Sequence, residues 1–285
     1  MAKLSKRVKA IKAKVDRNKV IKNKVVSPKN YDSIVPFMDI DLPKQALYKH
    51  NIMMLDIIRN NNWERPIYFS GGSPDPADYA WFQDYLQLDG LVYKLVPVKN
   101  AMAKDGNPMD MGFIDSDKMY NIVMKWQWGN SGSPDIYHDQ QTIRYSRNFR
   151  KNMALLTEQL IEEGKYEKAA KVADVVMKNL PPEYYSFYFI YEPFANAYYK
   201  NGNRKAAREL LTTLVNKYKE KLAYHKSLPI EDQNSEYQTI IRDIEQYRGL
   251  LLVMKANKDT ELYNSSKTDF NRLNKAFRQF ERDNE

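Results

Sequence analysis

Two stretches decide how the first part of this chain folds: NNNWERPIYF at residues 60–69 and LQLDGLVYKLVP at residues 86–97. Each leads into an apolar run of the length that strands favour. In the first, Pro66 precedes Ile67–Ser70, and proline is tolerated at the first position of a strand. In the second, the apolar run is Leu91–Val98. The sequence therefore predicts two short strands.

The segment between these strands has the pattern of a helix. Residues 77–88 run up to Gly90, and a glycine just past the last turn is a common way for a helix to end. Two strands joined by a crossover helix favour a parallel pair with a right-handed connection. We therefore expect a strand, a helix and a strand in a parallel arrangement.

Further elements flank this unit. Residues 38–42 alternate with period two, which predicts a short strand. Residues 44–60 place apolar side chains near helical spacing and end in a run of three asparagines. Asp115 can cap a helix that extends to about Trp126. Together these patterns predict a small α/β domain over residues 31–132.

The rest of the chain contains a helical repeat. EGKYEKAA at residues 163–170 aligns with NGNRKAAR at residues 201–208, and the two glycines are 38 residues apart. A glycine between two helices and a small residue five positions later resemble the tetratricopeptide pattern, whose ideal period is about 34 residues. A third pair over residues 235–255 and 259–281 would complete the stack. We expect a helical domain over residues 133–285 and an α+β chain as a whole.

The helical part holds a concentrated aromatic run, YYSFYFIY at residues 184–191. We expect these residues to form a helix that Pro193 kinks. The run is too aromatic to lie wholly on the surface, so it is read as core that also forms the lip of a binding groove. The predicted peptide- or partner-binding residues are Tyr184, Tyr188, Tyr191 and Tyr198.

One loop is a candidate ligand site. Gly71, Gly72 and Ser73 follow a predicted strand and precede a predicted helix, where many α/β proteins bind phosphate. The spacing fits neither of the glycine-rich phosphate motifs, and Asp75 and Asp78 bring negative charge to the helix start. A tight turn is the competing interpretation.

The net charge of +9 is unevenly distributed. Residues 1–30 hold 11 of the 45 Lys and Arg residues and one of the 36 acidic residues, which leaves 34 basic and 35 acidic residues elsewhere. We therefore expect a basic, flexible segment over residues 1–30 and a nearly neutral body. Such a segment is either a solvated linker or a contact for an anionic membrane surface, and the neutral body argues against nucleic acid.

Composition excludes several classes of protein and site. The chain has no cysteine, so disulfides, thiol catalysis and cysteine-bound zinc are excluded. Its three histidines are far apart and match no metal-binding spacing, so no metal and no cofactor is expected. The sequence contains neither an apolar run long enough to span a membrane nor the pattern of a secretory signal peptide.

The order and spacing of these motifs resemble one family, the bacterial integral-membrane glycosyltransferases described as protein O-mannosyltransferase-like. The resemblance rests on residues 63–69 and 86–97 and extends to residues 25–28, 34–36, 53–58, 117–120, 128–130 and 192–202. In relatives this region looks like the soluble portion that follows the membrane helices. The family's catalytic residues would lie in membrane-proximal loops that this sequence does not contain, so no catalytic residue is assigned.

The resemblance implies a non-catalytic accessory domain of a membrane protein glycosyltransferase system. Its expected partners are acceptor polypeptide or a multi-spanning transferase subunit, and its expected location is the periplasmic face of the membrane. The alternative is a stand-alone tetratricopeptide-like interaction scaffold without a role in sugar transfer, which would be cytoplasmic. The sequence leaves open whether the chain is a piece of a longer membrane protein or an independent product.

Overall fold

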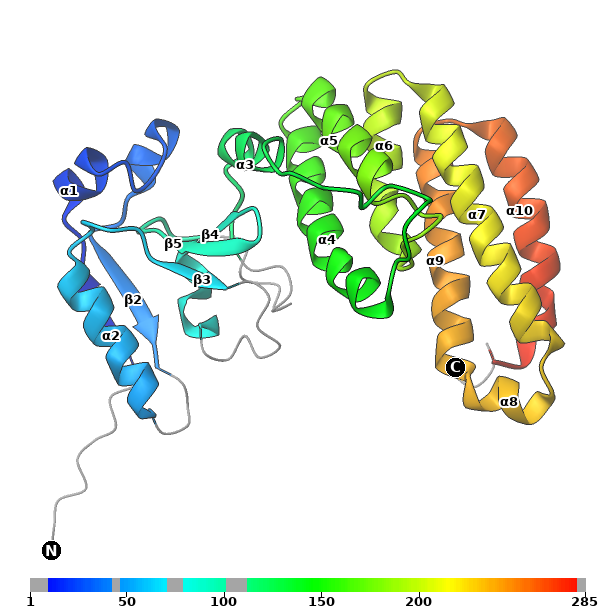
Figure 1. Ribbon diagram of the computed structural model, residues 1–285, viewed down its shortest axis with the longest axis horizontal. Coiled ribbons are helices and arrows are strands. Elements are labelled where there is room, and N and C mark those ends of the chain that lie inside the picture. The colour runs from blue at the N-terminus through cyan, green and yellow to red at the C-terminus, as the bar shows by residue number, and fades with distance from the viewer. Residues whose placement is uncertain (1–9, 43–46, 71–78, 101–111, 281–285) are drawn as a thin grey trace, which may run out of the picture. The chain divides into compact units, whose positions relative to one another are not determined.

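The computed structural model describes residues 10–42, 47–70, 79–100 and 112–280, the side chains of residues 278–280 excepted. The chain forms two compact units, residues 1–122 and 123–285 (Figure 1). The first contains two small antiparallel sheets with short helices, and the second is helical. The predicted α+β class is confirmed. Among the described residues, no helix combines the length and the apolar character needed to cross a membrane.

The basic N-terminal stretch is part of the first unit. Strand β1 (Ala10–Lys14) pairs antiparallel with β2 (Phe37–Asp41). Between them lie α1 (Arg17–Lys22), capped by Asp16, and the 3-10 helix η1 (Pro28–Ser33). Four valines of this stretch are buried, at positions 15, 20, 25 and 26.

The expectation of a flexible segment is therefore wrong for residues 10–30. In β1 exposed lysines alternate with half-buried Ile11 and Ala13, so the apolar side chains pack while the charged ends of the lysines reach solvent. The basic composition describes only the outer face of a folded segment. Residues 1–9 lie outside the described part of the chain.

Helix α2 (Lys49–Asn61) follows, close to the predicted bounds. It ends at Asn62, whose φ of 48° lies in the left-handed region, as the asparagine run predicts. The second sheet contains β3 (Tyr68–Ser70), β4 (Leu86–Asp89) and β5 (Val92–Leu95) in the order β3-β5-β4, with both pairs antiparallel.

The predicted parallel strand–helix–strand arrangement is wrong. The helix expected up to residue 88 is replaced by a 3-10 helix, η3 (Ala80–Tyr85), followed by strand β4. Leu86-Gln87-Leu88-Asp89 alternates with period two, and Gly90, with φ of 73°, turns the chain directly into β5. Gly90 therefore belongs to a hairpin instead of a helix end.

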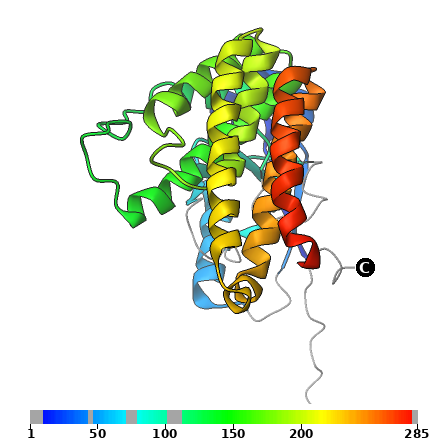
Figure 2. The same ribbon diagram turned by 90° about the vertical axis from the view of Figure 1, so that its right-hand side faces the viewer.

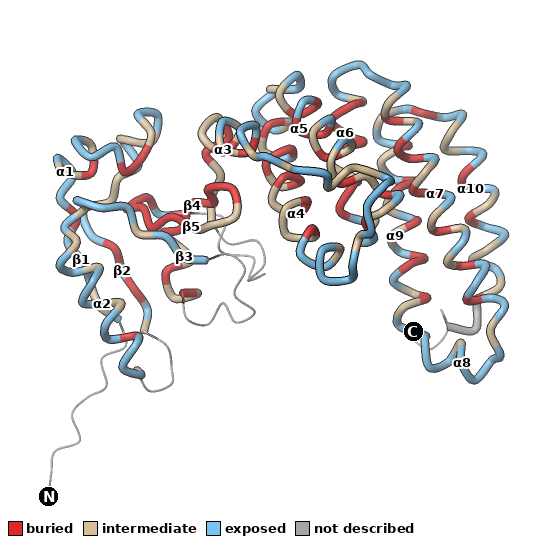
Figure 3. Tube along the Cα trace, viewed as in Figure 1, coloured by how far each residue is buried: buried red, intermediate tan, exposed pale blue. Residues whose placement is uncertain are grey.

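Both faces of this hairpin are buried (Figure 3). Gln87 lies opposite Lys94 in the ladder, and Asp89 is on the same face. Asp89 accepts hydrogen bonds from Gln87 Nε2 and Lys118 Nζ, each at 2.6 Å. Lys94 Nζ donates to the Val25 carbonyl at 2.5 Å. We refer to Gln87, Asp89, Lys94 and Lys118 as the polar cluster.

The polar cluster contains two lysines but only one carboxylate. Burial and the nearby charge of Lys118 together lower the pKa of Lys94 to about 8, while Asp89 acts in the opposite direction. Lys118 is carried by α3 (Ser116–Val123), whose start is fixed by Asp115, itself paired with Lys29 at 2.8 Å. One carboxylate thus makes two buried or half-buried cations tolerable.

The helical unit consists of three antiparallel helix pairs. The pairs are α4 (Gln140–Glu162) with α5 (Tyr166–Asn179), α6 (Glu192–Lys200) with α7 (Arg204–Ser227), and α9 (Tyr237–Ala256) with α10 (Thr260–Asn274). The predicted third pair is confirmed. The short helix α8 (Ile230–Ser235) joins the second and third pairs, and the 3-10 helix η7 (Lys275–Phe280) follows α10. Figure 2 shows α7 and α10 side by side, in agreement with their contacts.

In each pair, the turn between the two helices contains one residue whose φ lies in the left-handed region. These residues are Gly164 and Gly202, with φ of 71° and 80°, and Lys258, with φ of 53°. Ala169 and Ala207, predicted to be small for close packing, are fully buried. The third turn therefore has the geometry of the other two without their glycine.

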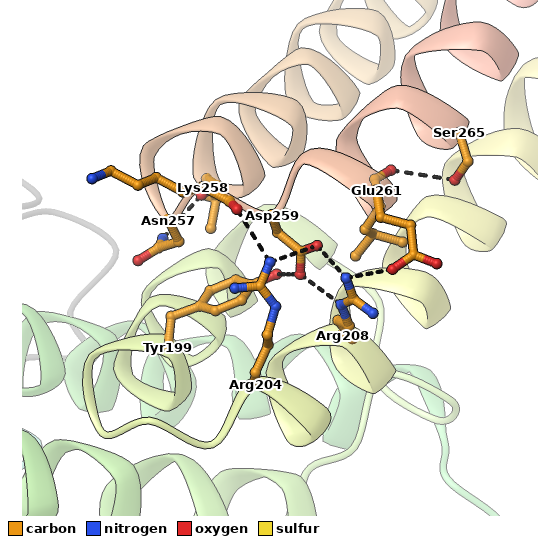
Figure 4. Close-up of polar contacts among 10 residues, drawn as sticks. Tyr199, Arg204, Arg208, Asn257, Lys258, Asp259, Glu261 and Ser265 are labelled. Atoms are coloured by element: carbon orange, nitrogen blue, oxygen red, sulfur yellow. Dashed lines mark hydrogen bonds and ion pairs between the residues drawn. The ribbon is translucent and has the colours of Figure 1, made fainter.

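The third turn is held by a polar network around Asp259 (Figure 4). Asp259 is fully buried and accepts hydrogen bonds from Arg208 at 2.7 and 2.6 Å and from the Tyr199 hydroxyl at 2.8 Å. Arg204 lies 3.1 Å from the same carboxylate and donates to the Lys258 carbonyl at 3.1 Å. The hydrogen bonds from Arg208 hold the pKa of Asp259 well below its usual range. The network ties the second pair to the third.

The polar cluster gives a first prediction. Substitution Asp89→Asn leaves Lys94 and Lys118 without the carboxylate that faces them, and we expect a loss of about 3 kcal/mol of local stability. Hydrogen exchange of the β4 and β5 amides measures this loss. The control Asp39→Asn removes a carboxylate from an exposed pair with Lys12 and should change protection by less than about 1 kcal/mol. Equal effects of the two substitutions would contradict the assignment.

The third turn gives a second prediction. Substitution Lys258→Gly relieves a left-handed residue and keeps the backbone carbonyl that Arg204 contacts, so we expect a gain of about 0.5–1 kcal/mol. Thermal unfolding followed by circular dichroism checks the sign. Lys255→Gly, in the last turn of α9, is the control and should destabilise by about 1 kcal/mol. A loss of stability in both variants would show that Lys258 is not strained.

Candidate functional site

The first helices of the three pairs lie next to one another. Helix α4 packs on α6, and α6 packs on α9. Five residues lie where these helices meet: Glu158 on α4, Glu192 and Asn196 on α6, Gly249 on α9, and Asn257 directly after α9. We refer to these five residues as the first-helix face. Stacked helix pairs present surfaces of this kind to polypeptide ligands.

A close approach between α6 and α9 shapes the centre of the first-helix face. A Cβ atom at Gly249 would lie 2.8 Å from Glu192 Oε1 and 3.2 Å from Oε2. A glycine inside a helix costs about 0.5–1 kcal/mol relative to alanine. Its place in the middle of α9 is explained by the carboxylate of Glu192, which occupies the space that a side chain would need.

Glu192 has an unusual electrostatic environment. Burial, together with the negative charge of Glu158, raises the pKa of its carboxyl to about 7. Near neutral pH the group therefore exists in both protonation states, and it can accept or donate a hydrogen bond. Beside it, Asn257 Nδ2 donates to Asn196 Oδ1 at 3.1 Å. The face thus offers carboxylate and amide groups, which match the N–H, C=O and hydroxyl groups of a polypeptide.

A buried arginine fixes the aromatic segment that precedes α6. Arg150 of α4 is fully buried and donates to the Ser186 carbonyl at 2.5 Å and to the Tyr191 hydroxyl at 2.9 Å. Its guanidinium lies 5.5 and 5.1 Å from the ring centres of Tyr185 and Tyr191. Burial lowers the pKa of Arg150. Carbonyls, hydroxyls and aromatic faces therefore hold this cation in the core.

The aromatic segment is not the predicted helix. Residues 188–191 form a 3-10 helix, η6 (Tyr188–Tyr191), after Phe187, whose φ is 67°. Helix α6 begins at Glu192, and Pro193 lies in its first turn. The predicted kink is therefore absent from this helix, because proline is readily accommodated at a helix start, where its missing N–H would have no partner.

The structure separates the four predicted tyrosines into two groups. Tyr191 and Tyr198 are buried, and their hydroxyls donate to the Leu180 carbonyl at 2.6 Å and to Asp174 at 2.8 Å. Tyr184 and Tyr188 are half-buried. Tyr184 stacks on His138, and Tyr188 lies edge-on to Tyr218. Packing accounts for the first group, and a binding role for the tyrosines stays a prediction.

The other predicted site cannot be placed. Gly71, Gly72 and Ser73 lie outside the described residues. Among the residues that are described, no group of three or more His, Asp or Glu side chains could hold a metal ion.

Sequence reasoning missed Arg150, Glu192 and Gly249. A signal existed for Gly249, because an isolated glycine within an apolar helical pattern indicates close packing. Glu192 carries no such signal, since an acidic residue in the first turn of a helix is ordinary. Arg150 stands among other basic residues of α4 and becomes distinct only through its burial.

Comparison with known protein families finds a similarity for part of the chain. Residues 7–118 match the family described as TMEM260-associated domain 2. The match covers nearly all of the first unit and none of the helix pairs. No curated protein and no solved structure matches the chain. The match is consistent with a glycosyltransferase-associated region.

Glu192 gives a pH-dependent prediction. Its pKa in the folded chain is about 7, above its ordinary value of 4.5, so the folded state keeps a proton that the unfolded state releases. The free energy of unfolding therefore falls as the pH rises from 4.5 to 7, because the unfolded state loses this proton first. Substitution Glu192→Gln should therefore stabilise the helical unit by about 1–2 kcal/mol at pH 8 and have little effect at pH 4.5.

Thermal unfolding at the two pH values measures this difference. Glu209→Gln, on the exposed side of α7, is the matched control and should show no such pH dependence. A gain of equal size at both pH values would mean that the effect of Glu192→Gln does not come from the charge.

Proposed function

We propose that this chain is a non-catalytic accessory part of a membrane protein O-mannosyltransferase system. The match of residues 7–118 to a TMEM260-associated domain supports the proposal, because TMEM260 is a protein O-mannosyltransferase. The resemblance of the motifs at residues 63–69 and 86–97 points the same way. The proposal assigns no catalytic residue to this chain, and it places the chain at the periplasmic face of the membrane.

Within this system, the helical unit binds acceptor polypeptide or a partner subunit. The observation that carries this assignment is the first-helix face, where α4, α6 and α9 bring two carboxylates and two amides together. An extended peptide presents an N–H and a C=O at each residue, and an asparagine amide can pair with both. Serine and threonine hydroxyls of an acceptor can donate to Glu158 and Glu192.

Peptide binding tests the assignment directly. Extended peptides rich in serine and threonine should bind the full chain, and the double substitution Asn196→Ala and Asn257→Ala should weaken binding about tenfold, because two hydrogen-bonding amides are lost. Fluorescence anisotropy with labelled peptides measures the affinity. Asn216→Ala, an exposed asparagine of α7, is the control and should leave affinity unchanged. Absence of peptide binding would refute acceptor recognition on this face.

A second experiment separates the two forms of the proposal from the scaffold alternative. A photo-reactive residue at position 196 is compared with one at exposed position 216 in native membranes. Cross-linking from position 196 to a multi-spanning glycosyltransferase would identify a partner subunit. Cross-linking to soluble proteins alone would favour an interaction scaffold without a role in sugar transfer.

A further inference from the structure

A groove in the first unit lies between α2 and the β1–β2 sheet. Its volume is about 520 Å³, within the range of ligand-binding pockets. Ile11 and Ile40 line it from the sheet, and Ile52, Leu55 and Ile58 line it from α2. The helix and the sheet therefore face each other across an apolar space large enough for a ligand.

Helix α2 is also apolar on its outer side. Met53 and Ile57 are 55% and 58% exposed and, four residues apart, occupy one face of the helix. Ile52, at the groove, is 56% exposed. A helix with apolar residues both toward and away from its own domain is typical of one that enters an apolar environment. A patch of this kind marks an interaction site.

The lining of the groove contains more basic than acidic residues. Lys12, Lys14 and Arg59 line it together with one acidic residue, Asp56. Lys12 pairs with Asp39 at 3.5 Å. Among the described residues, neither Lys14 nor Arg59 forms an ion pair. An apolar space bordered by two such cations is complementary to a molecule with an apolar chain and an anionic head.

We propose that this groove binds an acyl chain of an anionic membrane lipid, with the lipid phosphate against Lys14 and Arg59. Met53 and Ile57 then enter the apolar layer of the same membrane. This site lies in the first unit and is independent of peptide binding by the helical unit. As one of two alternatives, the sequence predicts a membrane contact through a flexible basic tail. In this proposal the contact is instead made by folded elements, with a cation from β1 and an apolar surface from α2.

Vesicle binding tests the proposal. The full chain should co-sediment with vesicles that mix phosphatidylglycerol into phosphatidylcholine and much less with phosphatidylcholine alone. The double substitution Met53→Gln and Ile57→Gln should weaken binding about tenfold or more, and so should Lys14→Glu with Arg59→Glu. Leu252→Gln and Lys226→Glu, at exposed positions of the helical unit, are the matched controls and should change nothing.

Two further experiments test whether the acyl chain of the lipid occupies the groove and whether binding requires both the head group and the acyl chain. Ala13→Phe fills the groove and should reduce vesicle binding while hydrogen exchange of the β1 and β2 amides stays unchanged, which separates loss of the groove from local unfolding. Glycerol phosphate, which carries the head without the chain, should not compete, whereas a short-chain phosphatidylglycerol should. Equal binding to both vesicle types would overturn the proposal. So would loss of vesicle binding together with cross-linking of position 57 to a protein segment, because the surface would then be a protein contact.

Discussion

A single left-handed residue between the two helices of each pair is the constraint on which the helical unit depends. It reverses the chain within a few residues, so the second helix packs against the first and the next pair can stack on both. Gly164 and Gly202 meet this constraint without strain. Lys258 does not, and there the buried carboxylate of Asp259 and its two arginines hold the turn. The contacts of α4, α6 and α9 along the first-helix face follow from these three turns.

The first unit solves a different problem, the burial of polar side chains on one face of a short hairpin whose other face is also buried. Gln87, Asp89 and Lys94 stand on one face of the sheet, and the opposite face is apolar. Unpaired, these groups would cost several kcal/mol each. Asp89 is hydrogen-bonded to Gln87 and to Lys118 of α3, and Lys94 is hydrogen-bonded to the Val25 carbonyl. These bonds satisfy the buried groups and connect the sheet to α3 and to the N-terminal segment. The motif at residues 86–97 is therefore a structural device that joins three parts of one unit.

Local patterns predicted much of the fold and less of the site. The helix pairs were predictable because glycine and alanine recur at fixed spacing in long periodic segments. The hairpin was not, since Leu86-Gln87-Leu88-Asp89 is too short to separate a strand from the last turn of a helix. The position of Glu192 beside Gly249 depends on packing between distant helices, which a single sequence does not show. The same holds for Arg150, whose burial distinguishes it from its basic neighbours.

The pairing of β1 with β2 sets the limits within which the first unit can be dissected. A fragment that starts at residue 31, where the sequence alone places the domain boundary, would lack β1 and the four buried valines that follow it. Met38 and Ile40 would lose the strand that lies beside them, and the free edge of β2 would be open to pairing with other chains. Ala10 is therefore the latest starting point for a fragment that retains this sheet, for example in a fusion to another protein.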